Sequence, residues 1–568
     1  MSTHTPRRST SRRMWAGGVV AACLVGLGIA SPAPHAVADD PPPHETTSPQ
    51  EAARVDNLPT PTLDWQPCKQ SQYREKLCAE VSLPLDYDEP DGARITVSVL
   101  KVPARNPEQR IGSLFVNPGG PGGSGMDFAA NSGATLSPEV LDRFDIIGMD
   151  PRGIGASSPL ECFEDPDAAI EALKPAWEMI FPVTKEETAV FQKSVRTIGQ
   201  ACGSHGKEMA SAMSTSQVAR DMEMLRRAVG DEKLSYFGFS YGSYLGQVYA
   251  NMYPDRVRAL VIDGVINPTE WLGSFNTSTI PFGVRIGSAE GADHAIKALM
   301  ERCAKVQDCP VADPEAALDR VLTRLQEQPI TFSDPDGSEQ VITYQRFTGV
   351  MLGLLYAPET VELVVEYVGV VDQLNPTTPM PEAERAVLGQ SFLRLEEKAQ
   401  EAVEDNTGSP NDPRIREAGL MKLRNDSRML SVICSEGSHP SERVMRRYSE
   451  VEKQRSPYFG QSWFWNQAAC ASPAWKARDE DSYRGPFNKR TSAPVMVVGN
   501  VFDPATNVHN ASEVARMLPN SRLIIANSWG HVAYRRSTCA TEKVDSYLIE
   551  PKDDRNFKCD DGWQPFNE

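Results

Sequence analysis

Leu234-Ser-Tyr-Phe-Gly-Phe-Ser-Tyr-Gly-Ser-Tyr-Leu-Gly246 is the stretch of the sequence that decides the fold. Its first half is short, apolar and aromatic, which predicts a buried strand that ends at Phe239. Its second half predicts the start of a helix. The pattern Gly-x-Ser-x-Gly, at 238–242, lies where the predicted strand ends and the predicted helix begins. This arrangement is typical of a nucleophile elbow, in which Ser240 takes a strained backbone conformation and lifts its hydroxyl above a sheet. The flanking glycines leave room for the turn.

Short strands and helices alternate on both sides of this stretch. Strands are predicted at 95–102, 113–116, 144–148, 234–239, 257–262, 494–499 and 522–526. Helical periodicity lies between them, as at 216–229, where apolar residues share one face. The alternation predicts an α/β fold with a mostly parallel sheet that is covered by helices on both faces.

The segment from 271 to 484 interrupts this alternation of strands and helices, because its sequence has helical periodicity, many charges and frequent prolines. An insertion of this length inside an α/β sheet predicts a large, mainly helical lid domain beside the active site. The predicted organisation is a signal peptide at 1–38, a flexible leader at 39–61, a sheet domain at 62–270 and 485–568, and the lid at 271–484.

The N-terminus predicts export. A basic stretch that contains Arg12 and Arg13 precedes an apolar run at 14–30, and Ala36-Val-Ala38 offers a cleavage site. The arginine pair leaves a twin-arginine route and the general secretory route equally open. Cys23 resembles a lipoprotein cysteine but falls inside the apolar run, so a lipid anchor is the less favoured alternative. The run is too short and too rich in glycine for a stable membrane span.

Cysteine usage agrees with export. Cys23 is one of eleven cysteines, and the even number that remains favours disulfides in an oxidising compartment. Short separations suggest the pairs Cys68–Cys78, Cys303–Cys309, Cys434–Cys470 and Cys539–Cys559, and leave Cys162 with Cys202. Spacing alone does not prove this connectivity. The sequence has no C-x-x-C pair and no H-E-x-x-H motif, so we expect no metal site.

The composition restricts the partners. The formal net charge is −18 at pH 7, and removal of the arginine-containing segment 1–38 makes it more negative. Such a surface repels phosphate backbones, so nucleic acid is not an expected partner. The apolar share of 40% and the charged share of 24% are those of an ordinary globular protein, and a monomer is favoured.

The elbow serine needs a base and an acid. A serine hydroxyl is a weak nucleophile until a base takes its proton, and in elbow proteins the order along the chain is serine, acid, histidine. His531 follows the last predicted strand by a short loop and is the candidate base, whereas we expect His509 on the surface of a helix. Asp503 follows the predicted strand that precedes the last one, and it is the candidate acid. Its alternative role is that of a helix N-cap. Thr506 is a candidate to support the Asp503 carboxylate.

Acyl transfer also needs donors for a negative oxygen. The backbone N–H of Tyr241, which follows the serine, is one candidate. The glycine-rich loop Asn117-Pro-Gly-Gly-Pro-Gly-Gly-Ser-Gly125 is expected to supply the other. We choose Gly120, because Pro121 has no N–H. The loop lacks the Gly-Lys-Ser/Thr of a Walker loop and the setting of a dinucleotide loop, so an oxyanion hole is favoured over a nucleotide site.

Together these motifs resemble secreted tripeptidyl aminopeptidases of the α/β-hydrolase superfamily and, more distantly, prolyl aminopeptidases. The resemblance rests on the glycine-rich loop, on Asp150-Pro-Arg-Gly-Ile-Gly-Ala-Ser157, on the elbow and on the later acid and histidine. It implies an α/β-hydrolase fold and a triad of Ser240, Asp503 and His531. It also implies an exported serine exopeptidase that acts without a cofactor on peptides with a free N-terminus.

Two other functions stay open at this stage. Relatives of this kind also include carboxylesterases, so a carboxylesterase or lipase with the same triad is the main alternative. A non-catalytic envelope protein on a retained hydrolase fold is the other; loss of a triad member would favour it, and none is lost.

An exopeptidase that acts from the amino end must hold the substrate ammonium with an anion, and acidic lid residues do this in such relatives. Glu436 is the candidate, because a disulfide at the neighbouring Cys434 would hold it near the core. A solvated surface glutamate is the alternative. Three lid tryptophans are candidates either for subsite walls or for core packing: Trp463, Trp465 and Trp475.

Overall fold

The computed structural model describes residues 43–566, apart from 275, 334–336, 375–379, 408–414, 472, 474 and 553–554, and describes no side chains for 403–419. The predicted signal peptide, its cleavage site and Cys23 therefore lie outside the described residues. Among the helices of the described part, none has the length and apolar content that a membrane span requires.

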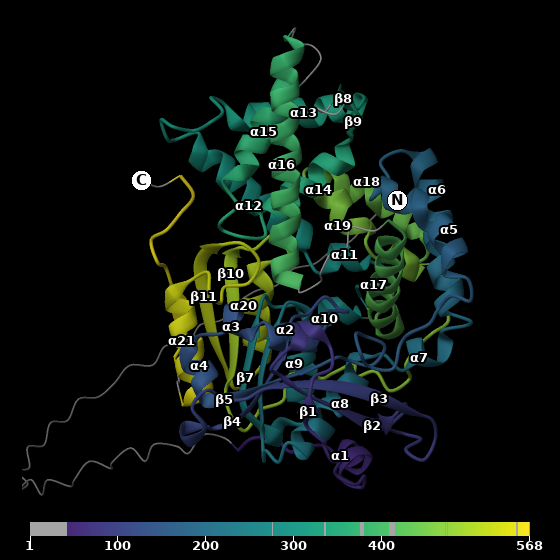
Figure 1. Cartoon of the computed structure of the whole chain (residues 1–568), viewed down its shortest axis with the longest axis vertical. Helices are drawn as coiled ribbons and strands as arrows, with labels where there is room; N and C mark the ends of the chain where they lie inside the picture. The colour runs from purple at the N-terminus through teal and green to yellow at the C-terminus, as the bar shows by residue number, and fades with distance from the viewer. Residues whose placement is uncertain are drawn as a thin grey trace, which may run out of the picture. The chain divides into compact units, whose positions relative to one another are not determined.

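A sheet of ten strands runs through the described part of the chain (Figure 1). The strand that leads into Ser240 is near the middle of the spatial order. In spatial order the strands are β1 (Gln66–Pro67), β2 (Leu77–Pro84), β3 (Arg94–Val102), β5 (Phe144–Met149), β4 (Gly112–Asn117), β6 (Leu234–Phe239), β7 (Val257–Asp263), β10 (Val495–Phe502), β11 (Ser521–Trp529) and β12 (Phe557–Cys559). Neighbours from β5 to β12 are parallel, and β1, β2 and β3 form an antiparallel edge. The predicted mostly parallel sheet and all seven predicted strands are confirmed.

Helices cover both faces of this sheet. The core on one face contains residues of α8 (Thr215–Ala228), α9 (Tyr241–Met252) and α20 (Val508–Met517). The core on the other face contains residues of α2 (Gly125–Ala130), α4 (Pro138–Arg143) and α21 (Thr538–Ile549). Successive residues of a strand point to opposite faces, so a strand buried on both sides must be apolar throughout. This is why the central strands were readable from the sequence.

The segment after β7 is mainly helical, as predicted for the lid. Its elements are α10 (Pro268–Leu272), α11 (Phe282–Arg285), α12 (Ser288–Cys303), α13 (Pro314–Glu327), the hairpin β8 (Ile330–Ser333) and β9 (Glu339–Ile342), α14 (Tyr344–Leu354), α15 (Leu363–Gln373), α16 (Glu382–Thr407), α17 (Ile415–Glu436), α18 (Glu442–Arg455) and α19 (Gly460–Trp465). These elements supply most of a separate apolar core.

Three earlier helices lie in the segment that the sequence analysis assigned to the sheet domain: α5 (Pro166–Met179), α6 (Lys185–Cys202) and α7 (Lys207–Ser211). Ala176 of α5 and Phe191 of α6 belong to the apolar core of the lid, and Phe191 packs edge-on against Trp465 with 5.8 Å between ring centroids. The lid is therefore built from two separate stretches of the chain. The segment order alone does not reveal this, because α5 and α6 precede the elbow.

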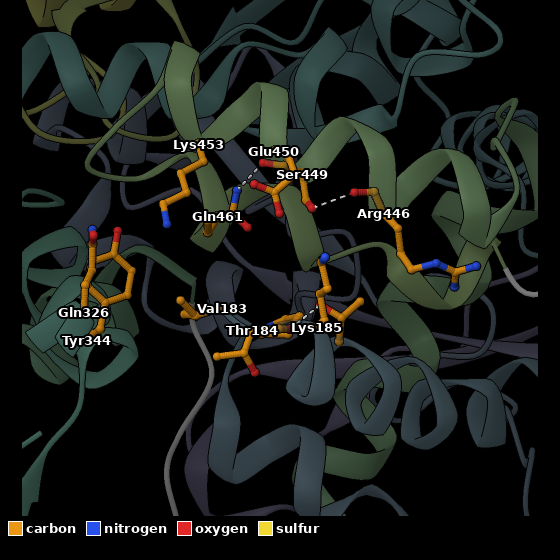
Figure 2. A pocket seen from close by; sticks show the side chains of 12 residues that line it. Val183, Thr184, Lys185, Gln326, Tyr344, Arg446, Ser449, Glu450, Lys453 and Gln461 are labelled. Carbon is orange, nitrogen blue, oxygen red and sulfur yellow. Dashed lines mark hydrogen bonds between the residues drawn. The ribbon is translucent and has the colours of Figure 1, made fainter. Parts of the chain in front are cut away.

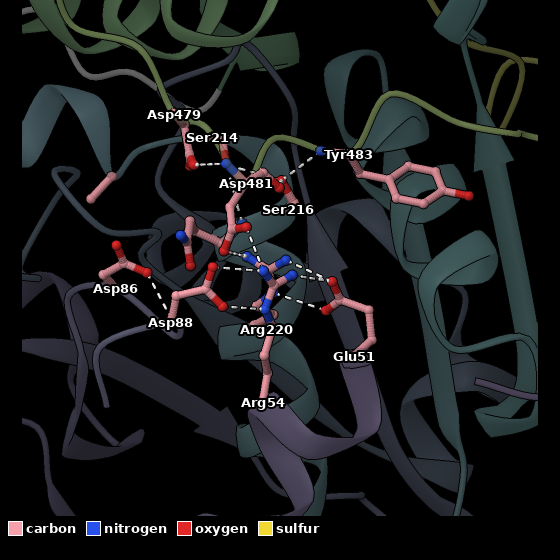
Figure 3. Close-up of polar contacts among 12 residues, drawn as sticks. Glu51, Arg54, Asp86, Asp88, Ser214, Ser216, Arg220, Asp479, Asp481 and Tyr483 are labelled. Atoms are coloured by element: carbon pink, nitrogen blue, oxygen red, sulfur yellow. Dashed lines mark hydrogen bonds and ion pairs between the residues drawn. The ribbon is translucent and has the colours of Figure 1, made fainter. Parts of the chain in front are cut away.

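The predicted flexible leader is wrong for residues 43–61. These residues include α1 (Pro49–Asp56), whose Arg54 lies beside Arg220 of α8 in a cluster of ion pairs (Figure 3). Arg54 pairs with Asp88 at 2.6 Å and with Asp481 at 2.5 Å, and Arg220 pairs with Glu51 at 2.8 Å. Composition predicted flexibility, but these charges find long-range partners that no local pattern shows.

The five disulfides suggested by the cysteine separations are confirmed. The described residues contain the pairs Cys68–Cys78, Cys162–Cys202, Cys303–Cys309, Cys434–Cys470 and Cys539–Cys559. One of them joins the end of α17 to the segment after α19, inside the lid.

The motif at 150–157 has a structural role through Arg152, which is fully buried. Its guanidinium donates to both oxygens of Asp221 of α8, at 2.7 and 2.9 Å, and the side chains of both residues are 0% exposed. Arg152 also donates to the carbonyls of Ala212 and Leu85. The pair therefore fixes α8 against the loop that follows β5.

Loss of Arg152 should destabilise the protein strongly. Arg152→Met leaves the Asp221 carboxylate buried without a cation, which typically costs about 3–5 kcal/mol. Arg110→Met is the matched control, because the Arg110–Asp145 pair is partly exposed, at 35% and 15%, and such pairs contribute about 0–1 kcal/mol. Urea unfolding of both variants with disulfides intact measures the difference. Equal losses of unfolding free energy would contradict this role for Arg152.

Candidate active site

Ser240 stands in the turn between β6 and α9, where the sequence predicts it. Its backbone has φ 54° and ψ −122°, a conformation that side-chain-bearing residues rarely adopt, and the predicted strain at the elbow is confirmed. The Ser240 N–H donates to the carbonyl of Asp263 at 2.9 Å, and its own carbonyl accepts from Ser243 N–H at 2.8 Å. The turn is thus held from β7 and from α9.

Glycines make this turn possible, because the chain comes very close to itself here. A Cβ atom on Gly119 would lie 2.5 Å from Phe239 O and 2.9 Å from Ser240 Cβ. A Cβ atom on Gly238 would lie 2.3 Å from Gly242 O. Any side chain at these glycines would clash with backbone, so the glycine-rich loop can lie directly against the nucleophile turn.

Asp503 and His531 form a buried pair at the ends of neighbouring strands β10 and β11. His531 Nδ1 lies 2.9 and 3.0 Å from the two carboxylate oxygens of Asp503, and the residues are 5% and 1% exposed. A ring nitrogen that donates to a carboxylate leaves Nε2 as the basic nitrogen, which is the tautomer a general base needs.

The Asp503 carboxylate accepts further hydrogen bonds that hold it in place. Donors are the backbone N–H groups of Ala505 and Thr506 at 2.8 Å, the Thr506 hydroxyl at 2.8 Å and the Val532 N–H at 3.0 Å. Burial acts to raise the pKa of Asp503, but His531 and these donors outweigh it and hold the pKa below its usual value. The predicted Thr506 support is confirmed. The alternative of a helix N-cap is wrong, because the N-cap of α20 is Asn507.

A second buried carboxylate, Asp263, connects the serine turn to the histidine loop, and the sequence analysis missed it. Its side chain accepts from the N–H groups of Ala533 and Tyr534 at 2.8–3.1 Å, while its backbone carbonyl accepts from Ser240. Burial raises the pKa of Asp263 to about 6. An aspartate as the last residue of a buried apolar strand was the signal that could have found it.

Gly264, the residue after Asp263, lies close to the imidazole ring of His531. A Cβ atom on Gly264 would lie 3.3 Å from His531 Cε1 and 3.2 Å from Thr506 Oγ1. The lid touches the same histidine, because the carbonyl of Tyr356 accepts from His531 N–H at 2.8 Å and the two rings meet edge to face at 5.4 Å. The end of β7, the histidine loop and the lid therefore meet beside Ser240.

The glycine-rich loop passes the backbone N–H of Tyr241. A Cβ atom on Gly119 would lie 2.9 Å from Tyr241 N, and the Gly119 N–H itself donates to Asn117 Oδ1 at 2.9 Å. Both Gly119 and Gly120 have positive φ, at 96° and 108°. Because Gly119 uses its N–H within the loop, Gly120 remains the better candidate for an oxyanion donor.

Asp150 holds the other end of this loop. Its carboxylate is 1% exposed and accepts from the Ser124 hydroxyl at 2.6 Å, from Met126 N–H at 3.1 Å and from Ala156 N–H at 2.7 Å. These contacts join the glycine-rich loop to the loop after β5. The two motifs that the sequence analysis quoted separately thus form one supporting unit.

Glu436, at the end of α17, is buried close to the elbow. Its carboxylate is 1% exposed and accepts from the hydroxyl and N–H of Thr215, at 2.8 and 3.1 Å, and from the indole N–H of Trp271 at 3.0 Å. Burial raises the pKa of Glu436 to about 7. The Tyr241 hydroxyl bonds to the same Thr215 hydroxyl at 2.6 Å. The alternative of a solvated surface glutamate is wrong.

The remaining sequence candidates divide clearly. His509 is 70% exposed and pairs with Glu513 at 3.1 Å, so its surface position is confirmed. Trp465 and Trp475 are buried in apolar cores, as expected for core packing. The Trp271 ring, which the sequence analysis did not select, lies at the elbow, 5.3 Å from the Tyr241 ring.

A cavity of about 280 Å³ lies in the lid, away from these groups (Figure 2). Its lining includes Lys185 of α6, Tyr344 of α14 and Lys453 of α18. None of the predicted site residues lines it. Within the described ranges, no three His, Cys, Asp or Glu side chains group closely enough to hold a metal ion.

Comparison with known proteins agrees with this geometry. Residues 112–277 match the family model described as alpha/beta hydrolase fold, and residues 456–559 match that of TAP-like proteins. The chain has the α/β-hydrolase fold. The two matched segments contain the elbow and the Asp503–His531 pair, and the chain is a serine hydrolase.

Named relatives extend over most of the chain. Serine protease Hip1 of Mycobacterium tuberculosis is 27% identical over 511 residues, which cover 86% of this chain and 88% of that protein. Tripeptidyl aminopeptidase of Streptomyces lividans is 27% identical over 516 residues, covering 88% and 86%. Carboxylesterase B of M. tuberculosis is 31% identical over 365 residues, covering 62% and 65%. The resemblance to tripeptidyl aminopeptidases is confirmed.

The buried Glu436 should make stability depend on pH. Its folded pKa of about 7 lies above the 4.5 of an exposed glutamate, so folding carries no penalty from ionisation below pH 4.5 and an increasing penalty as pH rises through 7. The full penalty corresponds to about 3 kcal/mol. Glu436→Gln removes it, so the variant's melting temperature should rise relative to wild type between about pH 5 and pH 8. A difference that is constant over this range would contradict the burial argument.

Proposed function

We propose that this serine hydrolase is an exported exopeptidase that releases short peptides, mainly tripeptides, from free N-termini. One observation supports the chemistry above all: Asp263, at the end of β7, holds both the Ser240 turn and the loop that carries His531. Its carbonyl accepts from Ser240 N–H, and its carboxylate accepts from N–H groups two and three residues after His531. The peptidase assignment draws support from the two relatives that match most of the chain and are named serine protease and tripeptidyl aminopeptidase.

In this proposal Ser240 attacks the scissile carbonyl and forms an acyl-enzyme. His531 Nε2 takes the hydroxyl proton and then gives it to the leaving amine, and Asp503 stabilises the imidazolium that forms between these steps. The N–H groups of Tyr241 and Gly120 bind the oxyanion. Water then enters, and the same histidine acts as the base for deacylation.

Glu436 is the proposed partner of the substrate α-ammonium. Among the described residues, the three donors to its carboxylate, from Thr215 and Trp271, are neutral, and no cation is in hydrogen-bond contact with this buried acid. Asp479 adds negative charge nearby, since it contributes to raising the pKa of Glu436. The ionised form of such a buried acid is stabilised most by a ligand that brings a positive charge. The ammonium would displace one of the neutral donors.

Export draws support from the disulfides. Five disulfides in one chain are typical of proteins that fold in an oxidising compartment. The proposal places the enzyme outside the cytoplasm, with the signal peptide at 1–38 removed.

A carboxylesterase is the second candidate, because Carboxylesterase B shares 31% identity over the matched residues. The triad would be the same, but no anion would be needed for a substrate ammonium. The two candidates therefore differ at Glu436 and in the substrate amine, and activated esters alone do not separate them.

A pair of tripeptide chromogenic amides tests the proposal, one with a free N-terminus and one acetylated. The purified mature protein should cleave the free amide about 100-fold faster in kcat/KM, because acetylation removes the charge that Glu436 binds. Ser240→Ala should cleave neither, and Glu436→Gln should lose most of the discrimination. Equal cleavage of both amides overturns the exopeptidase assignment, and cleavage of acyl esters alone supports the esterase.

Loss of the Asp503 charge should reduce turnover with little effect on binding. In Asp503→Asn the amide no longer stabilises an imidazolium at His531, and we expect kcat to fall about 10⁴-fold. Thr506→Val removes only one donor to the carboxylate and should lower kcat by about tenfold. Steady-state kinetics on the free tripeptide amide measures both. A larger loss in the Thr506 variant than in the Asp503 variant would contradict the assigned roles.

A further inference from the structure

Arg428 lies on α17, the lid helix that ends at Glu436, and it faces the glycine-rich loop. A Cβ atom on Gly122 would lie 3.8 Å from Arg428 Cβ and 3.6 Å from Met429 N. Gly122 is two residues from the candidate oxyanion donor Gly120, and the loop is closed by a hydrogen bond from Gly123 N–H to Gly119 O at 3.2 Å. The arginine therefore stands beside the loop that borders Ser240.

This arginine is partly buried and has no partner in the described part of the chain. Within the described residues no hydrogen bond or ion pair reaches its guanidinium, and its Nε is buried without an acceptor. Other buried arginines differ: Arg152 pairs with a carboxylate, and Arg285 of the lid donates to several backbone carbonyls. Buried charges in proteins are normally paired, so an unpaired one beside a reaction centre indicates an anionic ligand.

The charged groups around Arg428 do not neutralise it. Asp150 is the nearby anion, but its carboxylate already accepts three hydrogen bonds, from the glycine-rich loop, the first turn of α2 and the loop after β5. Arg424, one turn earlier on α17, adds a second positive charge. Burial and Arg424 lower the pKa of Arg428, and Asp150 only partly offsets them. The site thus has a local excess of positive charge in a strongly acidic protein.

The position along α17 separates this cation from the proposed ammonium site. Arg428 and Glu436 are about two turns apart, roughly 12 Å along the helix axis. A short extended peptide spans that distance in about four residues. One helix would therefore present an anion and a cation to the two ends of a short segment that crosses Ser240.

We infer that Arg428 binds a carboxylate of the peptide substrate close to the scissile bond and gives the enzyme a preference for acidic peptides. The carboxylate is either an aspartate or glutamate side chain or the C-terminal carboxylate of a short substrate. A guanidinium is suited to either, because its planar fork of donors matches a carboxylate. This inference rests on the proposed peptidase function.

Matched peptide pairs test it. In the first arm, free tripeptide amides carry glutamate or glutamine at each position in turn. In the second arm, a neutral tetrapeptide carries a C-terminal carboxylate or a carboxamide. Wild type, Arg428→Gln and the control Arg424→Gln are compared by kcat/KM. Wild type should favour the charged member of at least one pair by about tenfold, as for a charge-assisted hydrogen bond. Arg428→Gln should lose this preference and keep its rate on the neutral member.

The arm that shows the preference identifies the source of the carboxylate. Equal rates of wild type on both members of every pair, or a preference that survives in Arg428→Gln, overturn the inference while leaving the peptidase function intact. Failure of wild type to cleave any peptide overturns the proposed function, and the inference with it. The control should keep most of the preference, because Arg424 is exposed.

Melting temperatures distinguish a binding role from a structural one. An unpaired, partly buried cation costs folding free energy, so Arg428→Gln should melt at the same temperature as wild type or higher. A clear decrease in melting temperature, with equal loss on charged and neutral peptides, would assign Arg428 to structure and overturn the inference. Arg428→Lys keeps the charge without the fork and should retain part of the preference.

Discussion

Ser240 holds a backbone conformation, φ 54° and ψ −122°, that the chain maintains only because its surroundings fix it from several sides. Its N–H donates to Asp263 O, its carbonyl accepts from α9, and Gly119 packs against its Cβ. Each contact sets the position of another part of the site. The glycine-rich loop can approach because Gly119 has no side chain, and the histidine loop is held by the carboxylate of the same Asp263.

The lid completes this arrangement from two directions. On one side, the carbonyl of Tyr356 accepts from the backbone N–H of His531. On the other side, the Trp271 ring packs against the Tyr241 ring and its indole N–H donates to Glu436. These contacts give the lid a share in the geometry of the reaction as well as in access to it. In the proposed function they also explain why a hydrolase of this fold needs so large an insertion: the lid supplies the charges that select the substrate.

The sequence predicted the parts of the molecule that follow local rules. Strands buried on both faces read as apolar runs, the elbow has a fixed glycine spacing, and Asp503 and His531 end consecutive late strands. Four cysteine pairs followed from their short separations, and Cys162–Cys202 was the pair that remained. Each of these signals depends on residues that lie close together in the chain.

The features that escaped prediction depend on distant residues. Helices α5 and α6 join the lid through an apolar core to which segments far along the chain contribute, and α1 is fixed by ion pairs to Asp88, Arg220 and Asp481. The sequence analysis assigned no role to Asp263 or to Arg428. Their roles arise only when the fold brings the glycine-rich loop, α17 and the histidine loop together.

Covalent labelling of the nucleophile tests the central claim most directly. The mature protein would be treated with a fluorophosphonate, digested and analysed by mass spectrometry, with His531→Ala as the matched control. The account predicts one phosphonylated serine, Ser240, with labelling at least about 100-fold slower in the control, because the hydroxyl loses its base. Labelling at a different serine, or equal labelling of Ser240 without His531, would contradict the site described above.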